Sequence, residues 1–143
     1  MRNIDMASTG SKSLADLFPP YITSLDPDAV VSSLNFLVSG FESEIYTFQL
    51  QRPGSPPENY ILRLFAGEGA AEKLTREARA LSLLQAAGYP VPELLLQESD
   101  PRILGKPFEV IEKLDGQALW PVLASAEPDR QGQLLSRFSA LLA

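Results

Sequence analysis

The sequence contains no cysteine and no histidine among its 143 residues. The lack of cysteine excludes disulfide bonds, thiolate nucleophiles and zinc sites built on thiolates. The lack of histidine excludes Ser-His-Asp and Cys-His catalysis, His-ligated metals and an imidazole general base. Any chemistry must therefore come from carboxylates, amines, guanidinium groups, hydroxyls and the backbone. Those groups suit the binding of a phosphorylated ligand better than hydrolysis.

Long apolar runs and clusters of basic residues are also missing. No run approaches the roughly 20 apolar residues that span a bilayer, and the polar segment 1–12 lacks the apolar core of a signal peptide. The net charge is −6, with no basic cluster that could follow a phosphate backbone. We therefore expect a cytoplasmic protein with neither nucleic acid nor membrane as a partner. Residues 1–12 are expected to be a flexible tail.

The first third of the sequence predicts short helices followed by a pair of strands. Ser13 is predicted to cap a short helix that stops at Pro19-Pro20, and Asp26-Pro27-Asp28 is typical of a second helix start. Apolar and polar residues then alternate over 34–38 and again over 46–50. This alternation predicts two strands joined by a short loop.

The remaining sequence predicts three more strands and two helices. Residues 60–65 (YILRLF) are almost all apolar, which predicts a central strand. A long helix is predicted from about Gly69 to Ala87, because Gly88 and two prolines follow it. We therefore expect an α+β fold: a five-stranded, mainly antiparallel sheet with one long helix after the third strand, plus N-terminal and C-terminal helices. The other predicted elements are strands at 93–97 and 107–112 and a last helix over about 128–143.

Two charged residues stand where apolar ones are expected. Glu77 lies in the stripe of the long helix that also holds Leu74, Leu81 and Leu84. Arg63 is the one charge inside the apolar third strand. Because a carboxylate that faces a sheet costs several kcal/mol unless it is paired, the two charges are predicted to form a buried pair. The alternatives are an ion pair with a purely stabilising role, or a Glu77 that reaches the edge of the helix.

The loop between the first two strands contains Gly40, where backbone N–H groups can close over an anion. A single glycine in such a loop is also typical of an ordinary hairpin. The order of elements is more specific than the loop itself. It runs strand, glycine loop, strand, basic strand, acidic helix and then two strands.

These segments resemble the aminoglycoside phosphotransferase-like family, also called the phosphotransferase enzyme family, which has a protein-kinase-like fold. LVSGFESEIYTFQL looks like the first hairpin of that family, and YILRLF looks like its basic third strand. LTREARALSLLQAAGYPVPELL is similar to its acidic helix and the entry to its fourth strand. ILGKPFEVIEKLDG is similar to the strand that runs into the hinge. The resemblance covers about residues 34–143 and is most specific over 76–116.

The resemblance implies a nucleotide site in an N-terminal lobe. Arg63 would contact the α and β phosphates, where many relatives have lysine, and Glu77 would hold Arg63 in place. Gly40 and Ser43 would cover the phosphates, and Ile61 lies on the same face as Arg63. The implied ligand is ATP, with GTP left open.

The adenine would lie at the other end of the same pocket. By the resemblance, Ile111 would lie beside the adenine, while the carbonyl of Glu112 and the N–H of Leu114 would bind its edge. The loop departs from the family pattern, because Ser39 and Ser43 replace residues that are often glycine or asparagine there. Glu42 and Glu44 also place negative charge near the phosphates, unless both side chains point to solvent.

The parts that perform phosphoryl transfer in this family belong to a C-terminal lobe. They are a His-x-Asp-x-x-x-x-Asn segment and a later metal-binding motif, and neither is found here. The sequence therefore predicts no catalytic and no metal-binding residue, and Mg²⁺ and a small-molecule hydroxyl acceptor only in a full-length protein. The lobe is expected at 13–116. Residues 117–143 are expected to begin the C-terminal lobe, so that the chain is truncated and inactive alone.

The last predicted helix carries an apolar stripe that leaves a second interpretation open. The stripe consists of Leu134, Leu135, Phe138, Leu141 and Leu142. It predicts packing against something else, either a C-terminal lobe, a second copy in a dimer, or the sheet of this domain. The alternative function is a stand-alone, non-catalytic lobe that serves as a protein-interaction module. A hydrolase that uses Glu42 and Glu44 is a third, weaker interpretation.

Overall fold

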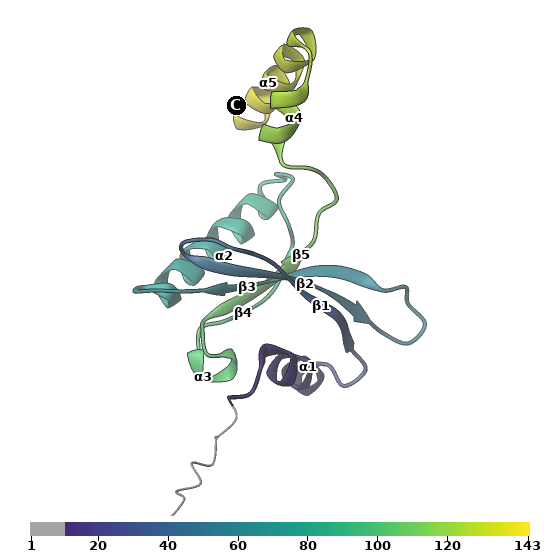
Figure 1. The fold of residues 1–143 in the computed structure, drawn as a ribbon, viewed down its shortest axis with the longest axis vertical. Coiled ribbons are helices and arrows are strands. Elements are labelled where there is room, and N and C mark those ends of the chain that lie inside the picture. Colours follow the sequence, from purple (N-terminus) through teal and green to yellow (C-terminus); the bar gives the residue numbers. More distant parts are fainter. Residues whose placement is uncertain (1–10) are drawn as a thin grey trace, which may run out of the picture. The chain divides into compact units, whose positions relative to one another are not determined.

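The computed structural model describes residues 11–143, and residues 1–10 of the expected tail lie outside this range. Figure 1 shows the fold. The chain divides into two compact units, of which the first ends at Lys113 and the second is Leu114–Ala143. The first unit contains α1 (Leu14–Leu25), β1 (Val30–Ser39), β2 (Ser43–Gln51), β3 (Glu58–Phe65), α2 (Ala70–Ala86), β4 (Leu94–Glu98), α3 (Pro101–Leu104) and β5 (Phe108–Glu112). The second contains α4 (Leu119–Ser125) and α5 (Pro128–Leu142).

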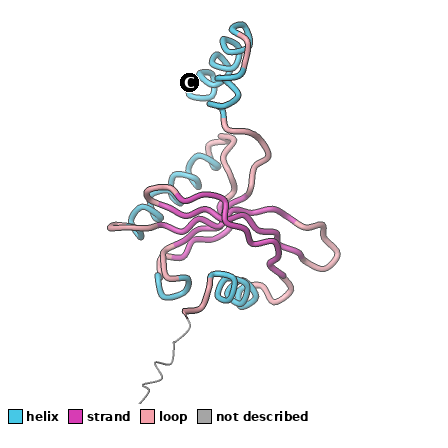
Figure 2. The backbone as a smooth tube through the Cα atoms, viewed as in Figure 1, coloured by secondary structure: helices cyan, strands magenta, loops and turns pink. Residues whose placement is uncertain are grey.

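The five strands form one sheet in the order β1-β2-β3-β5-β4 (Figure 2). Every neighbouring pair in this sheet is antiparallel. The helix α2 follows the third strand, so the predicted α+β class and the predicted position of the long helix are confirmed. The strand β3 lies in the middle of the sheet, as its nearly continuous apolar sequence predicts.

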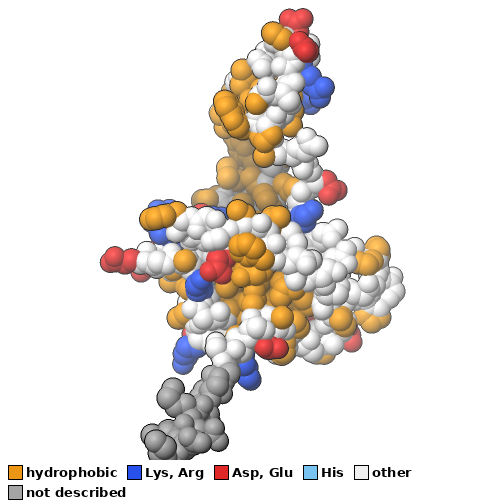
Figure 3. All heavy atoms as spheres, viewed as in Figure 1, with side chains coloured by type: hydrophobic (Ala, Val, Ile, Leu, Met, Phe, Trp, Pro, Cys, Tyr) orange, Lys and Arg blue, Asp and Glu red, His pale blue; other side chains and the backbone are white. Residues whose placement is uncertain are grey.

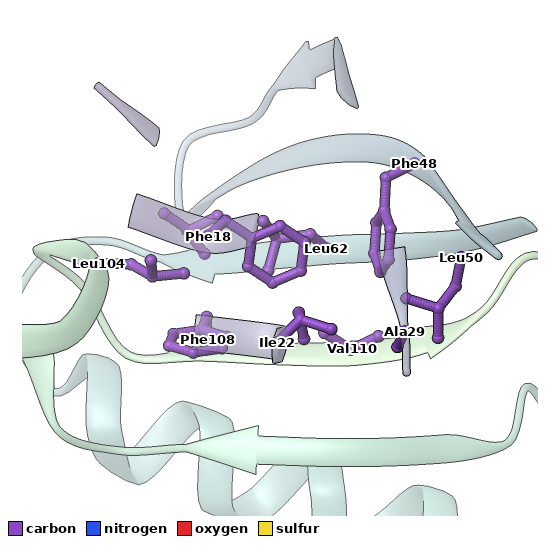
Figure 4. Close-up of a cluster of buried hydrophobic side chains, with 10 residues drawn as sticks. Phe18, Ile22, Ala29, Phe48, Leu50, Leu62, Leu104, Phe108 and Val110 are labelled. Atoms are coloured by element: carbon purple, nitrogen blue, oxygen red, sulfur yellow. The ribbon is translucent and has the colours of Figure 1, made fainter. Parts of the chain in front are cut away.

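One face of the sheet is covered by α1. Alternation along β3 directs Leu62 and Leu64 to this face, where both are buried. Phe18 and Ile22 of α1 join the same hydrophobic cluster together with Phe108 of β5 (Figure 4). The ring of Phe18 packs edge-on against that of Phe48, with centroids 4.9 Å apart. This core is the main hydrophobic layer of the first unit.

The N-terminal helix is longer than predicted. Ser13 caps α1 together with Asp16, but the helix continues through Pro19 and Pro20 to Leu25. Each interior proline costs a helix about 3 kcal/mol. The buried stripe of this helix lies on both sides of the prolines, and its burial offsets that cost.

No second helix starts at Asp26, where one was expected. The backbone N–H of Asp26 ends α1 by donating to Ile22, and its carboxylate accepts the N–H of Asp28 in a turn. The strand β1 begins only two residues later, at Val30. Side-chain bonding to the local backbone is the usual competitor of helix formation at Asp, and here the turn replaces the helix.

The opposite face of the sheet carries α2, whose buried residues are Leu74 and Ala78. The stripe expected to face the sheet was Leu74, Leu81 and Leu84. Leu84 is 38% exposed, so the helix is rotated about its axis relative to that expectation. Phe65 is the buried aromatic residue of β3 on this face. Since alternation places Arg63 beside Phe65, the helix α2 lies on the same side of the sheet as Arg63.

Two short helices were not predicted. The first, α3, lies between the predicted strands at 93–97 and 107–112, where the carboxylate of Asp100 accepts the N–H of Arg102 and caps a four-residue helix. The second, α4, has Pro121 at its third position, where a proline is tolerated because no intrahelical donor is lost. The last helix, α5, agrees with the predicted range. None of the helices in residues 11–143 has the length and apolar character needed to cross a membrane.

The left-handed backbone conformation at the end of α2 can be tested by substitution. Gly88 follows the C-cap with φ +80°, and an added Cβ would meet no atom within 4 Å. A Gly88→Ala change therefore acts only through the left-handed backbone, and it is expected to lower the free energy of unfolding by about 1 kcal/mol. Gly132→Ala, inside α5, is the control and is expected to have the opposite sign. Urea denaturation measures the free energy of unfolding of both variants. An unchanged value for Gly88→Ala would contradict the left-handed conformation of Gly88.

Candidate functional site

Arg63 is the centre of the site because three strands and one helix converge on it. It is the sixth residue of β3, and its Cα partners are Ile45 of β2 and Glu109 of β5. Its side chain points away from the core under α1, since Leu62 and Leu64 take that face. The arginine is therefore presented on the side of the sheet that carries α2.

Three groups hold the guanidinium of Arg63. Nη1 forms an ion pair with Glu77 of α2, so the predicted Arg63–Glu77 pair is confirmed. Nε donates to the hydroxyl of Ser43, at 3.2 Å, and the guanidinium carbon lies 4.9 Å from the centre of the Phe65 ring. Nη2 has no hydrogen-bond partner among the described residues. The arginine is thus fixed on two sides and has a free donor edge.

The pair is half-exposed, and the prediction of a buried pair was wrong in this respect. The side chain of Arg63 is 29% exposed and that of Glu77 is 41% exposed. The cause is the rotation of α2, which turns Leu74 and Ala78 into the sheet and leaves Glu77 at the flank of the buried stripe. A flank position costs Glu77 less desolvation than a central one, and it keeps the pair open to a ligand.

Glu109 is a third charged residue of the site, and the sequence analysis missed it. Its side chain is fully buried, and neither of its carboxylate oxygens has a hydrogen-bond partner among the described residues. Burial, helped by repulsion from Glu77, raises the pKa of Glu109 to about 7, although Arg63 acts in the opposite direction. Its Oε1 lies 3.9 Å from Nη1 of Arg63. The charge in the apolar segment PFEVIE was the signal that could have found it.

The loop between β1 and β2 differs from a phosphate-binding glycine loop. The N–H of Gly40 donates to the carbonyl of Ser43, at 2.8 Å, and so closes the hairpin. Gly40 does not have a positive φ, and an added Cβ would meet the Ser43 carbonyl oxygen at an ordinary 3.6 Å. The Ser43 hydroxyl is engaged by Arg63. The N–H of Gly40 is therefore occupied by a bond within the chain, whereas the Ser43 hydroxyl accepts from Arg63 and keeps its own hydrogen to donate.

The two acidic residues of this region are each paired with a lysine. Glu42 lies 3.1 Å from Nζ of Lys73, which belongs to α2. Glu44 pairs with Lys106, and this hydrogen bond lowers the pKa of Glu44. The negative charge that the sequence placed near the phosphates is therefore compensated locally.

The residues expected near the adenine lie in the central strands. Ile61 and Ile111 are direct Cα partners in β3 and β5, and both are half-buried on the face of Arg63. The N–H of Glu112 donates to the carbonyl of Glu93, at 2.9 Å. Leu114 is the first residue of the second unit, whereas the other seven predicted residues belong to the first. The two isoleucines form an apolar surface beside the arginine.

A separate cavity of about 390 Å³ opens on the other face of the sheet. Its apolar lining includes Phe48, Leu50 and Val110 of the core under α1. Its rim holds Arg52, whose Nε lies 2.8 Å from a carboxylate oxygen of Asp26. The sheet therefore separates this cavity from Arg63. Within residues 11–143, no group of three or more acidic side chains is placed to hold a metal ion.

The sequence matches a protein-family model over most of its length. The model of the phosphotransferase enzyme family matches residues 33–143, which include β1 from Ser33 onwards and every later element. The chain belongs to the phosphotransferase enzyme family. The match covers both the pair of Arg63 with Glu77 and the strand that carries Glu109.

Other comparisons found distant similarity only. No curated protein matches this phosphotransferase-family chain significantly. One similar solved structure is a provisionally assigned aminoglycoside phosphotransferase from Ralstonia eutropha JMP134, with 24% sequence identity and a TM-score of 0.48. The alignment covers 69% of this chain and 27% of that one. The chain thus spans about a quarter of the length of that protein.

Proposed function

We propose that this chain is the ATP-binding N-terminal lobe of a cytoplasmic phosphotransferase that transfers a γ-phosphoryl group to the hydroxyl of a small molecule. The observation that carries the proposal is the guanidinium of Arg63, held by Glu77 and Ser43 beside the apolar surface of Ile61 and Ile111. Membership of the phosphotransferase enzyme family supports it.

The geometry around Arg63 suits a diphosphate. Glu77 and Ser43 fix Nη1 and Nε, so the side chain does not have to lose all of its freedom on binding. The unengaged Nη2 then offers a charged donor to a phosphate oxygen, and hydrogen bonds of this kind are about twice as strong as neutral ones. The half-buried isoleucines would lie under the adenine ring, and the carbonyl of Glu112 would bind its edge.

The described residues do not fit a magnesium site, because no carboxylate cluster is available to hold the ion. We therefore propose that Mg²⁺ and the acceptor hydroxyl are bound by parts of a longer protein. The 143 residues alone are expected to bind nucleotide weakly and to turn over no ATP. Release of inorganic phosphate or transfer to an alcohol by the purified chain, at a rate above the background, would contradict this expectation.

A series of nucleotides tests where the affinity comes from. Because Arg63 would contact the α and β phosphates, the affinity is expected to rise from adenosine to AMP and again to ADP. The rise at each step should disappear in Arg63→Ala but persist in the Arg52→Ala control, since Arg52 pairs with Asp26 on the other face of the sheet. Calorimetric titration with each ligand, and with GTP for base preference, measures the series. Equal affinities for adenosine and ADP in the wild-type chain would contradict the proposed site.

A protein-interaction module is the second candidate function. It is favoured by the apolar stripe of α5, of which Leu135, Phe138 and Leu141 are exposed. Hydrophobic side chains are visible on the surface of the second unit in Figure 3. Leu134 is half-buried and Leu142 is exposed. A stripe of this kind would also serve as a dimer contact. Sedimentation velocity tests the dimer. A sedimentation coefficient that remains that of a monomer at every protein concentration would contradict it.

A further inference from the structure

Glu109 and Glu77 face the same cation from two directions. Glu77 reaches Arg63 from α2, while Glu109 is the residue directly opposite Arg63 in the β3–β5 ladder. Arg63 and Glu77 are the charged groups that act on Glu109, and its partner in β4 is the neutral Gln97. One guanidinium therefore serves two carboxylates, of which only Glu77 is bonded to it.

The geometry leaves Arg63 close to a second binding position. Its Nη1 lies 3.9 Å from Oε1 of Glu109, which is about 1 Å beyond a charge-assisted hydrogen bond. Glu109 cannot move away, because its backbone is fixed in the middle of the sheet between β3 and β4. The arginine is held only through side-chain bonds to Ser43 and Glu77, so its long, partly exposed side chain is the partner that can shift between the two carboxylates.

The charge of Glu109 decides which position is favoured. Burying an ionised carboxylate without a hydrogen bond costs much free energy. In surroundings of low polarity its charge also attracts the guanidinium strongly. When Glu109 is protonated, the attraction is lost and the ion pair with Glu77 is the stronger interaction. We propose that Glu109 is a second positioning residue for Arg63, drawing the guanidinium towards β5 when it is ionised and releasing it to Glu77 when it is protonated.

A consequence for ligand binding rests on the proposed function. With Glu109 ionised, the three side chains carry a net charge of −1, and with Glu109 protonated they are neutral. Phosphate groups therefore bind best to the protonated form, and nucleotide affinity should fall as the pH rises through the pKa of Glu109, which is about 7. If only the protonated form binds, the loss between pH 6 and pH 8 is about tenfold.

The first arm of the test needs neither nucleotide nor variant. The side-chain carboxyl carbon of Glu109 and the Nε–Hε group of Arg63 are assigned by NMR in the wild-type chain and followed from pH 5 to pH 8.5. Both resonances are expected to titrate with one midpoint near 7. An Arg63 resonance that stays constant while Glu109 titrates would overturn the proposal, as would a Glu109 midpoint in the ordinary carboxyl range.

The second arm measures the dissociation constant of ATP between pH 6 and pH 8 for the wild type and for Glu109→Gln. At each pH the dissociation constant of the wild type is divided by that of Glu109→Gln, so that the titration of ATP itself cancels. This ratio is expected to rise about tenfold. Asp28→Asn removes one negative charge from an exposed residue and is the matched control, for which the ratio to wild type should stay flat.

The two arms separate the two claims. Shared titration of Arg63 and Glu109 in a chain that binds no ATP would support the positioning role and overturn the proposed function. ATP binding with a flat ratio between wild type and Glu109→Gln would leave the function in place and overturn the link to phosphate affinity. If Glu109→Gln does not fold, the first arm alone decides the positioning role.

Discussion

Replacing Arg63 with alanine is expected to weaken ATP binding about thirtyfold. The change removes the one guanidinium that lies among Ser43, Glu77 and Glu109. A hydrogen bond to a charged group contributes roughly 1.5–3 kcal/mol, and about 2 kcal/mol corresponds to a thirtyfold change in the dissociation constant. Isothermal titration with ATP at pH 6.5, with far-UV circular dichroism to confirm folding, measures the effect.

Two further variants make this result specific. Arg63→Lys keeps the charge but loses the bond from Nε to Ser43, so an intermediate loss is expected. Arg52→Ala removes a different arginine, which pairs with Asp26 on the far face of the sheet, and should leave the affinity unchanged. Equal losses from Arg63→Ala and Arg52→Ala would indicate a general charge effect and contradict a site at Arg63.

Replacing Glu109 with glutamine is expected to change how stability depends on pH. The pKa of Glu109 is raised from 4.5 to about 7 by folding, so the folded protein favours the protonated form. The stabilising contribution of this proton is complete below pH 4.5 and is lost as the pH rises to about 7. A shift of this size corresponds to about 3 kcal/mol in all, and the wild type should lose most of it between pH 5 and pH 8 relative to Glu109→Gln.

Urea denaturation at several pH values checks this expectation. The difference in the free energy of unfolding between the variant and the wild type should grow from pH 5 to pH 7 and level off by pH 8. Asp28→Asn serves again as the control, because Asp28 is exposed. A constant difference across this range would show that Glu109 does not titrate there in the folded protein.

The succession of strands and the long helix along the chain, and the pair of Arg63 with Glu77, could be predicted because local patterns indicate them. Alternation in β2 and the apolar run of β3 are properties of single segments. Arg63 and Glu77 were recognisable because each is a charge in an otherwise apolar pattern. The element order then matched a family, and the family model confirms that match.

The parts that could not be predicted depend on contacts between distant segments. The helix α1 continues through two prolines because Phe18 and Ile22 pack onto strands that come later in the chain. The rotation of α2, which leaves Glu77 half-exposed, is likewise set by packing on the sheet. Glu109 was missed because a short strand with two glutamates does not show which one faces inwards. Only its pairing between β3 and β4 buries it.

The central claim is that nucleotide binds on the face of the sheet that carries Arg63. An NMR titration of the isotope-labelled chain with ATP tests it most directly. We expect the largest shifts at Arg63 Nε–Hε and at the amides and methyl groups of Ile61 and Ile111. Shifts confined to Phe48, Leu50 and Val110, which line the cavity of about 390 Å³ on the other face, would contradict it.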